Sequence, residues 1–314
     1  MAKNMYQKRE ERKQNKESNI EVSNSKTNIN WYPGHMVKAQ NEIKLDLKLI
    51  DIVIEVLDAR IPISSQNPII NNLSKDKSRL VILNKADLAD KIATKNWKNY
   101  FEKQGVTCVL TNASSGENIK NVIEAIKKIG KDIYDKKDAL KTNTININHI
   151  YRVLIVGIPN VGKSTLINKI ANKQVANVGN KPGITKKKQW IKVANNIDLL
   201  DTPGLLWPKF EDQSVGIKLA LTGNIKQEIL DIEFLACEGI KMLSNNITYK
   251  ETLKNRYCLI EKDFEMDPYD ILEKIGRKKG CLISGGNVNM EKVCKIFLDE
   301  FKSGKIGNIT LDNV

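Results

Sequence analysis

The sequence predicts an α/β domain with a mostly parallel six-stranded sheet, followed by a small all-α domain. In the first two thirds of the chain, short apolar, β-branched runs alternate with longer helix-compatible stretches, as in sheets covered by helices on both faces. After Pro208 these runs stop, and apolar residues recur at the three- and four-residue spacing of amphipathic helices. This change of pattern places the boundary between the two domains near that proline.

Six runs are expected to form the strands of the sheet. They are short successions of apolar and β-branched residues at 51–58, 79–84, 106–110, 151–157, 189–193 and 197–201. Little more than Ala194 to Asn196 separates the last two runs, which is the spacing of a hairpin. One of these two strands should therefore run antiparallel at the edge of the sheet.

The rest of the chain divides into a tail, a linker and helices. Residues 1–29 are basic and nearly free of large apolar side chains, which predicts a flexible basic tail ahead of an α/β domain over 30–208. Residues 135–150 are polar and rich in Asn and Thr, as expected for an exposed linker inside that domain. The helical domain is expected over 209–314. Its helical spacing is found in four segments, 225–243, 249–262, 267–280 and 289–304.

Composition excludes several classes of protein. With 41% hydrophobic and 28% charged residues among 314, the chain is neither disordered nor collagenous. No apolar run approaches the roughly 20 residues of a membrane span, and the five cysteines never form a C-x-x-C pair. We therefore expect a cytoplasmic protein with reduced thiols and no membrane partner. Glutamates in the N-terminal tail make an organellar matrix the weaker alternative.

The chain is strongly basic, with 51 Lys and Arg residues against 37 Asp and Glu residues and a formal net charge of +14. Such a surface attracts polyanions, of which nucleic acid is the first to consider. Coding bias and simple solubility would give the same excess, so charge alone leaves both interpretations open.

A phosphate-binding loop is predicted where the fourth strand ends. Gly157 to Ser164 follow the pattern G-x-x-x-x-G-K-[ST], directly between a predicted strand and the helical TLINKIAN. Such a loop turns backbone N–H groups toward a phosphate, while its lysine reaches the β- and γ-phosphates and its hydroxyl ligates Mg²⁺. The residues expected to bind nucleotide here are Pro159, Asn160, Val161, Gly162, Lys163, Ser164 and Thr165, with Lys163 also catalytic and Ser164 also a metal ligand.

Two further segments complete the predicted metal and γ-phosphate site. Asp201 ends the sixth predicted strand, where its carboxylate can hold Mg²⁺, and the N–H of Gly204 can face the γ-phosphate. Thr185 lies in the turn-forming K-P-G-I-T stretch (181–185) and is expected to ligate the metal when the γ-phosphate is present. A nucleoside triphosphate with Mg²⁺ is therefore the predicted ligand.

The base is predicted to be guanine. Asn84, Lys85 and Asp87 belong to the N-K-A-D segment that begins at the end of the second strand. A carboxylate there accepts from both the ring N–H and the exocyclic amine of guanine, a donor pair that adenine lacks. A second segment expected at the base follows the third strand and contains Asn112, Ala113 and Ser114. It is placed to offer a backbone N–H to the guanine carbonyl, so GTP and GDP rather than ATP are predicted.

The order of these motifs resembles that of the circularly permuted Ras-like P-loop GTPases, and most closely the ribosome biogenesis GTPase A family. N-K-A-D (84–87) and N-A-S-S-G (112–116) precede the phosphate-binding loop (157–164), whereas ordinary Ras-like enzymes have the opposite order. The resemblance covers residues 30 to about 300. It implies a GTPase that acts as an assembly factor for the large ribosomal subunit, binds its rRNA, and is a monomer away from the particle.

The resemblance extends to the segments W-Y-P-G-H-M (31–36) and D-A-R (58–60) and implies how hydrolysis is triggered. Leu205 stands where Ras-like enzymes have a water-orienting Gln, so intrinsic hydrolysis should be slow and the particle should stimulate it. His35 is the catalytic candidate that the family implies, and a packing role is its alternative. Asn160 matches the residue that helps hold K⁺ in potassium-activated relatives.

Several interpretations stay open at this point. Arg60 either touches phosphate or rRNA or pairs locally. The basic clusters 186–188 and 277–279 are either rRNA contacts or solvated faces. Residues 205–210 lead from the predicted switch into the helical domain. Through them, a change in the contacts to the γ-phosphate could reach that domain directly. Two other functions compete with that of an assembly factor. The first is a regulatory GTPase with a protein effector and no RNA partner, and the second is an RNA-binding protein that uses GTP only structurally.

Overall fold

A six-stranded sheet forms the centre of the larger half of the molecule. The computed structural model describes residues 43–139, 149–176, 189–194, 196–204, 206–207, 212–225 and 231–314. The strands are β1 (Ile52–Asp58), β2 (Ser78–Asn84), β3 (Thr107–Leu110), β4 (Tyr151–Val156), β5 (Gln189–Ala194) and β6 (Ile197–Asp201), in the order β3-β2-β1-β4-β6-β5. Neighbours pair in parallel except β5, which pairs antiparallel with β6 at the edge. The predicted strands and the antiparallel edge are confirmed.

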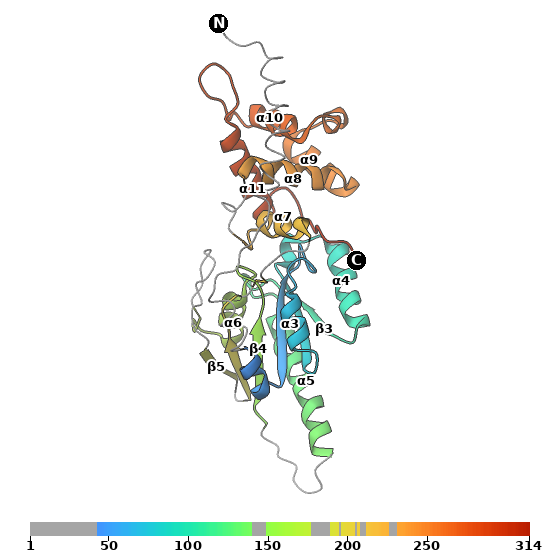
Figure 1. Cartoon of the computed structure of the whole chain (residues 1–314), viewed down its shortest axis with the longest axis vertical. Coiled ribbons are helices and arrows are strands. Elements are labelled where there is room, and N and C mark those ends of the chain that lie inside the picture. Colours follow the sequence, from blue (N-terminus) through green and yellow to red (C-terminus); the bar gives the residue numbers. More distant parts are fainter. Residues whose placement is uncertain are drawn as a thin grey trace.

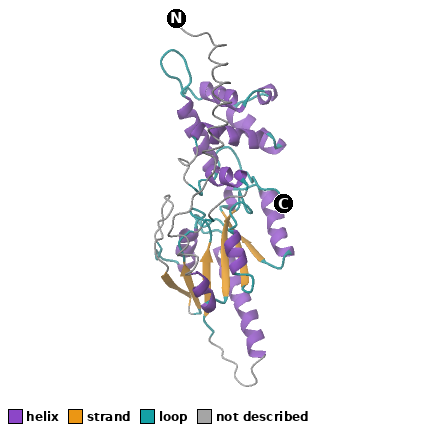
Figure 2. Cartoon of the chain, viewed as in Figure 1, coloured by secondary structure: helices purple, strands orange, loops and turns teal. Residues whose placement is uncertain are grey.

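Helices cover both faces of this sheet (Figure 2). Because successive strand residues point to opposite faces, β1 and β2 supply apolar side chains to two separate layers. The helices α3 (Pro68–Leu73) and α4 (Lys91–Lys103) lie on one face, and α5 (Ile119–Ala139) lies on the other. On the α4 side, Trp97 and Phe101 are buried in one cluster with Leu57 and Leu83.

The linker after α5 is shorter than the sequence suggested. The helix continues to Ala139, so the predicted linker start at 135 is wrong, and residues 140–148 lie outside the described part of the chain. Aromatic packing accounts for the extra helical turn. The ring of Tyr134 stacks on that of His149 with centroids 3.8 Å apart, and His149 Nε2 lies 3.2 Å from Asp138 Oδ2. This second histidine therefore has a local structural role.

The helical part of the chain contains α7 (Gln213–Leu221), α8 (Ile232–Ser244), α9 (Ile247–Tyr257), α10 (Pro268–Lys278) and α11 (Met290–Lys302). Each begins directly after an Asp or Asn whose side chain accepts a backbone N–H of the first turn, which stabilises a helix start. These capping residues are Asp212, Asp231, Asn246, Asp267 and Asn289. The predicted domain boundary at 208/209 falls outside the described residues. Among the described helices, none combines the length and the apolarity needed to cross a membrane.

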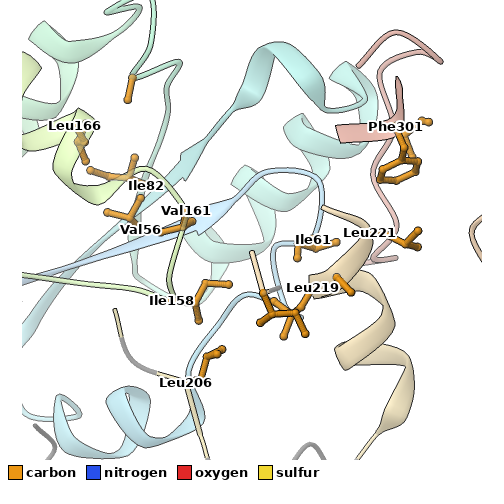
Figure 3. Close-up of a cluster of buried hydrophobic side chains, with 14 of the residues drawn as sticks. Val56, Ile61, Ile82, Ile158, Val161, Leu166, Leu206, Leu219, Leu221 and Phe301 are labelled. Atoms are coloured by element: carbon orange, nitrogen blue, oxygen red, sulfur yellow. The ribbon is translucent and has the colours of Figure 1, made fainter. Parts of the chain in front are cut away.

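The apolar core runs without a break from the sheet into the helical part. Figure 3 shows Val56 and Ile82 of the strands at one end of the cluster and Leu219, Leu221 and Phe301 of α7 and α11 at the other. Figure 1 shows the helical part standing over the end of the sheet toward which the arrows of the parallel strands point. The helices are thus packed against the carboxyl edge of the sheet, where the predicted site residues lie.

The cysteines agree in part with the expected buried thiols. Cys108, Cys281 and Cys294 are buried, whereas Cys237 is half-buried and Cys258 is exposed at the end of α9. Burial raises the pKa of the Cys108 and Cys294 thiols to about 12, which keeps them protonated at neutral pH. All five cysteines are free, as predicted.

Candidate functional site

The predicted nucleotide motifs meet at the carboxyl edge of the sheet. Asp58 and Asn84 are paired at the ends of β1 and β2, and Asp201 pairs with Ile155 near the end of β4. Parallel strands bring their carboxyl ends to one edge, and open α/β sheets bind ligands outside that edge. Segments that are far apart in the sequence therefore form one site.

Lys163 belongs to the phosphate-binding loop and is also the first residue of α6 (Lys163–Ala171). Its ammonium donates to the backbone oxygens of Gly157 and Ile158, each at 2.9 Å, and the side chain is buried. Burial lowers the pKa of Lys163 to about 8, with the negative charge of Asp201 acting in the opposite direction. A buried ammonium at a helix N-terminus is suited to neutralising phosphate oxygens.

Two glycines allow the loops of the site to approach one another. A Cβ at Gly162, where φ is +102°, would lie 2.3 Å from Asn84 Nδ2. A Cβ at Gly204 would lie 2.8 Å from the backbone nitrogen of Pro159. These distances are below any normal contact, so both positions require glycine. Gly204 thus lies against the phosphate-binding loop, as its predicted γ-phosphate role requires.

Asp201 supplies the feature of the site that points to a cation. The residue is 1% exposed, and neither carboxylate oxygen has a hydrogen-bond partner among the residues that the structure describes. Burial raises the pKa of Asp201 to about 6, against the positive charge of Lys163, which lowers it. Buried polar oxygens are rarely left unpaired, and carboxylate oxygens are preferred Mg²⁺ ligands. Asp201, with the Ser164 hydroxyl at the start of α6, therefore fits a Mg²⁺ that would neutralise phosphate charge.

The raised pKa of Asp201 predicts a pH dependence of stability in protein free of nucleotide and metal. Since the folded pKa of about 6 exceeds the ordinary 3.8, the folded state binds the extra proton between these values. The contribution of Asp201 to the free energy of unfolding is therefore greatest below about pH 4. It falls as the pH rises from about 4 to about 6. Over that pH range, the free energy of unfolding of the wild type should fall by about 3 kcal/mol relative to that of Asp201→Asn. Urea unfolding in EDTA at several pH values measures the difference, and parallel curves for the two proteins would contradict the prediction.

The N-K-A-D segment is organised by Asn84, which is 2% exposed. Its Nδ2 donates to the backbone oxygen of Val161 at 2.8 Å, and its Oδ1 accepts from the backbone N–H of Ala113 at 2.9 Å. Asn84 thus ties the phosphate-binding loop to the segment after β3. Lys85 follows in the left-handed conformation with φ of +60°, and Asp87 is exposed in the short helix η2 (Ala86–Leu88).

The 112–116 segment forms a tight turn held by Asn112. The Asn112 Oδ1 accepts from the backbone N–H groups of Ser114 and Ser115, at 2.9 and 3.2 Å. With Ala113 bonded to Asn84, the N–H groups of three successive residues are engaged inside the protein. A contact from this segment to the guanine carbonyl stays a prediction.

The nucleotide site and the fold agree with three comparisons to known proteins. Residues 152–262 match the family model described as 50S ribosome-binding GTPase. Ribosome biogenesis GTPase A of Bacillus licheniformis is 45% identical over 284 residues, which are 90% of this chain and 98% of that protein. The corresponding Thermotoga maritima protein is 32% identical, over 90% of this chain and 94% of its own. The chain belongs to the ribosome biogenesis GTPase A family.

A solved member of the ribosome biogenesis GTPase A family has the same fold. The GDP-bound structure of YlqF from T. maritima superposes with a TM-score of 0.64 at 28% identity, covering 87% of this chain and 98% of that one. The predicted fold class, a circularly permuted Ras-like P-loop GTPase domain with a helical part, is confirmed. The chain is a GTPase, as predicted.

Asp58 and Arg60 of the D-A-R segment form a buried ionic cluster that the sequence analysis left undecided. Arg60 Nη2 lies 2.7 Å from Asp58 Oδ2, and Lys85 Nζ lies 2.9 Å from the same oxygen. Arg60 is 2% exposed and its guanidinium pairs with Asp58, which supports the local-pairing interpretation. Burial alone would raise the pKa of Asp58, but the charges of Arg60 and Lys85 hold it well below its usual range.

The turn after α7 connects this cluster and the phosphate-binding loop to the helical part. Asn224 Nδ2 donates to Asp58 Oδ2 at 3.0 Å, and Arg60 Nη2 donates to the backbone oxygen of Thr222 at 2.8 Å. Asn160 Nδ2 donates to the backbone oxygen of Gly223 at 3.0 Å. Sequence reasoning missed the T-G-N turn because its letters are those of an ordinary turn and no local pattern marks its distant partners.

Some predicted residues cannot be placed. His35, Thr185, Leu205 and the basic cluster 186–188 lie outside the described residues. The second basic cluster, 277–279, is described and is engaged locally: Arg277 pairs with Glu273 at 2.7 Å, Lys278 donates to the backbone oxygen of Cys258, and Lys279 pairs with Glu300 at 3.1 Å. These contacts favour a structural role for that cluster.

Proposed function

We propose that this GTPase is an assembly factor for the large ribosomal subunit, that it binds the rRNA of the particle, and that the particle stimulates its GTP hydrolysis. The observation that carries the nucleotide part is the buried Asp201 carboxylate beside Lys163, whose oxygens have no hydrogen-bond partner within the described part of the chain. The ribosomal part is supported by the names of the relatives and by the net charge of +14. We place the protein in the cytoplasm, as a monomer away from the particle.

The proposed nucleotide contacts follow from the described site. Residues 159–165 surround the phosphates, which accept from the backbone N–H groups of residues 160–165 and from the Lys163 ammonium, and Gly204 faces the γ-phosphate. Ser164, Asp201 and Thr185 hold Mg²⁺, which stabilises the charge that develops on the phosphate oxygens. Asp87 selects guanine, with Lys85 and Asn84 supporting its loop and residues 112–114 completing the base site.

Hydrolysis needs a group that activates water. Leu205 can neither donate nor accept a hydrogen bond, so this group must come from elsewhere. We propose His35 for this role, in a conformation that the particle orders. Asn160 is proposed to hold a K⁺ ion at the phosphates. Its Nδ2 already donates to Gly223, so its Oδ1 is the atom that would ligate the cation.

The test is GTP hydrolysis by the purified chain, with and without purified large subunits, in K⁺ and in Na⁺ buffer. For wild type we expect strong stimulation by the subunits, greater in K⁺ than in Na⁺. His35→Ala should lose about 10²–10⁴-fold of the stimulated rate, the usual size of a general-base contribution, while GTP affinity is retained. His149→Ala is the matched control, because His149 contacts only residues near α5 in the described structure, and its rate should be unchanged.

Other outcomes separate the alternatives. Stimulation that survives His35→Ala would return His35 to a packing role and assign water activation to K⁺ at Asn160 or to the particle. An absence of stimulation by subunits would favour a regulatory GTPase with a protein effector and no RNA partner, the second candidate, against which the basic charge of the chain argues.

A further inference from the structure

The loop that carries Asp87 is held by a distant segment of the chain, residues 308–312, which follows α11. We propose that this segment, and Asn308 in particular, positions the loop for guanine recognition. Asn308 Nδ2 donates to the backbone oxygens of Asp87 and Ala89, at 2.8 and 3.1 Å. The inference rests on the proposed role of Asp87 and extends the base site to a residue 221 positions away.

The contacts complete the backbone hydrogen bonding of the loop. The helix η2 is a single turn, and the last carbonyls of a helix have no partner inside it. The backbone N–H of Ile309 donates to the oxygen of Leu88 at 3.1 Å. Together with Asn308 it satisfies three successive carbonyl groups, those of residues 87–89. The segment therefore acts as an end cap supplied from elsewhere in the chain.

The segment is itself fixed to the sheet domain. Thr310 Oγ1 accepts from the backbone N–H of Asp90 at 3.2 Å, and the N–H of Leu311 donates to the backbone oxygen of Arg60 at 2.7 Å. Asp312 accepts from both the N–H and the hydroxyl of Ser64, each at 2.7 Å. Residues 309, 310 and 312 are nearly fully buried. Asn308 itself is exposed, but it directly precedes these buried and multiply bonded residues, which are rigid enough to set the position of the loop.

The same segment is bonded to the helical part. The Tyr249 hydroxyl of α9 donates to the backbone oxygen of Thr310 and accepts from its N–H, each at 3.0 Å. Lys218 of α7 pairs with Asp312 at 2.8 Å. Figure 1 shows the chain leaving α11 and running down to the start of α4, where the label C stands. The position of the guanine-specific loop therefore depends on residues from both parts of the molecule.

The chemistry of the base gives a readout for this role. Asp87 is expected to accept from the ring N–H and from the exocyclic amine of guanine, and hypoxanthine lacks that amine. The ratio of the GDP and IDP affinities therefore reports how well the carboxylate is aligned, because misalignment weakens the double contact more than the single one. Loss of one aligned hydrogen bond changes affinity by about 2- to 10-fold.

The experiment measures dissociation constants of fluorescently labelled GDP and IDP with the full chain. Asn308→Ala should weaken GDP binding about 3- to 10-fold and IDP binding less, and should raise KM for GTP with little change in kcat. Asn308→Gln keeps the amide donor and should recover part of the GDP preference. Asn287→Ala removes the same group from an exposed turn in the helical part, and should leave both constants unchanged.

Asp87→Ala separates failure of the inference from failure of the proposed base site. If Asp87→Ala keeps the GDP preference, Asp87 does not read the base and the inference falls with that assignment. If Asp87→Ala loses the preference but Asn308→Ala keeps it, the inference alone is overturned. Equal weakening of GDP and IDP by Asn308→Ala, together with a lower melting temperature, would mean general stabilisation and would also overturn it.

Discussion

Replacing Lys163 by Ala is expected to lower kcat/KM for GTP hydrolysis about 10²- to 10³-fold, the loss seen when one donor to a developing charge is removed. Lys163 is buried at the start of α6 and already donates to two carbonyl groups of the phosphate-binding loop. The substitution removes the ammonium of the phosphate-binding loop, and it also removes the positive charge that acts on the buried Asp201 carboxylate. GTP hydrolysis measured over a range of GTP concentrations gives kcat and KM separately.

Lys131→Ala is the matched control for this prediction. Lys131 is exposed on α5 and follows Gly130, which packs against Tyr151 at the start of β4, at the edge of the sheet opposite the nucleotide motifs. We expect its hydrolysis rate to stay within about 2-fold of wild type, because surface substitutions of this kind have small effects. A Lys163→Ala protein that keeps more than about a tenth of the wild-type kcat/KM would contradict the proposed phosphate role of Lys163.

Replacing Asp58 by Ala is expected to lower the free energy of unfolding by about 3–5 kcal/mol, the cost of leaving buried charges without their partner. Asp58 is fully buried and accepts from Arg60, Lys85 and Asn224. The side chain of Arg60 is only 3% exposed, so water cannot replace the carboxylate. Because the folded pKa of Asp58 is held below its usual range, this contribution is fully present at pH 7.

The control for the stability prediction is Asp76→Ala. Asp76 is exposed in the turn between α3 and β2, and its replacement should change the free energy of unfolding by less than about 0.5 kcal/mol. Urea unfolding at pH 7.5, followed by circular dichroism, compares the two variants. A loss below about 1 kcal/mol for Asp58→Ala would mean that the cluster is hydrated in solution, contrary to its burial.

The strands and the phosphate-binding loop could be predicted because their signals are local. The β5–β6 hairpin follows from the two or three residues between two apolar runs, and the loop at 157–164 follows from a spacing that only a strand-to-helix turn accommodates. The extent of α5 could not be predicted in the same way. The last turn of α5 is polar. It is held by the stacking of Tyr134 on His149, a residue on the other side of residues 140–148.

The base loop shows why part of the site was not predictable. The N-K-A-D letters predict that Asp87 recognises guanine, but the partner of its loop, Asn308, is separated from it by 221 positions. Asn308 follows two glycines, Gly304 and Gly307, after the end of α11, so its sequence context is that of an ordinary loop. Nothing near it in the chain indicates that its amide faces the carbonyl groups of residues 87 and 89.

The amino-acid sequence by itself determined the family, the strands and the motifs that contain the proposed site residues Lys163, Asp201 and Asp87, because a short backbone spacing is enough to specify each motif. Tertiary structure alone decided the state of those groups. Burial lowers the pKa of Lys163 and raises that of Asp201, and the Asp58 cluster and residues 308–312 join the site to the helical part. These properties depend on contacts between residues that are distant in sequence, and such contacts form only when the chain is folded.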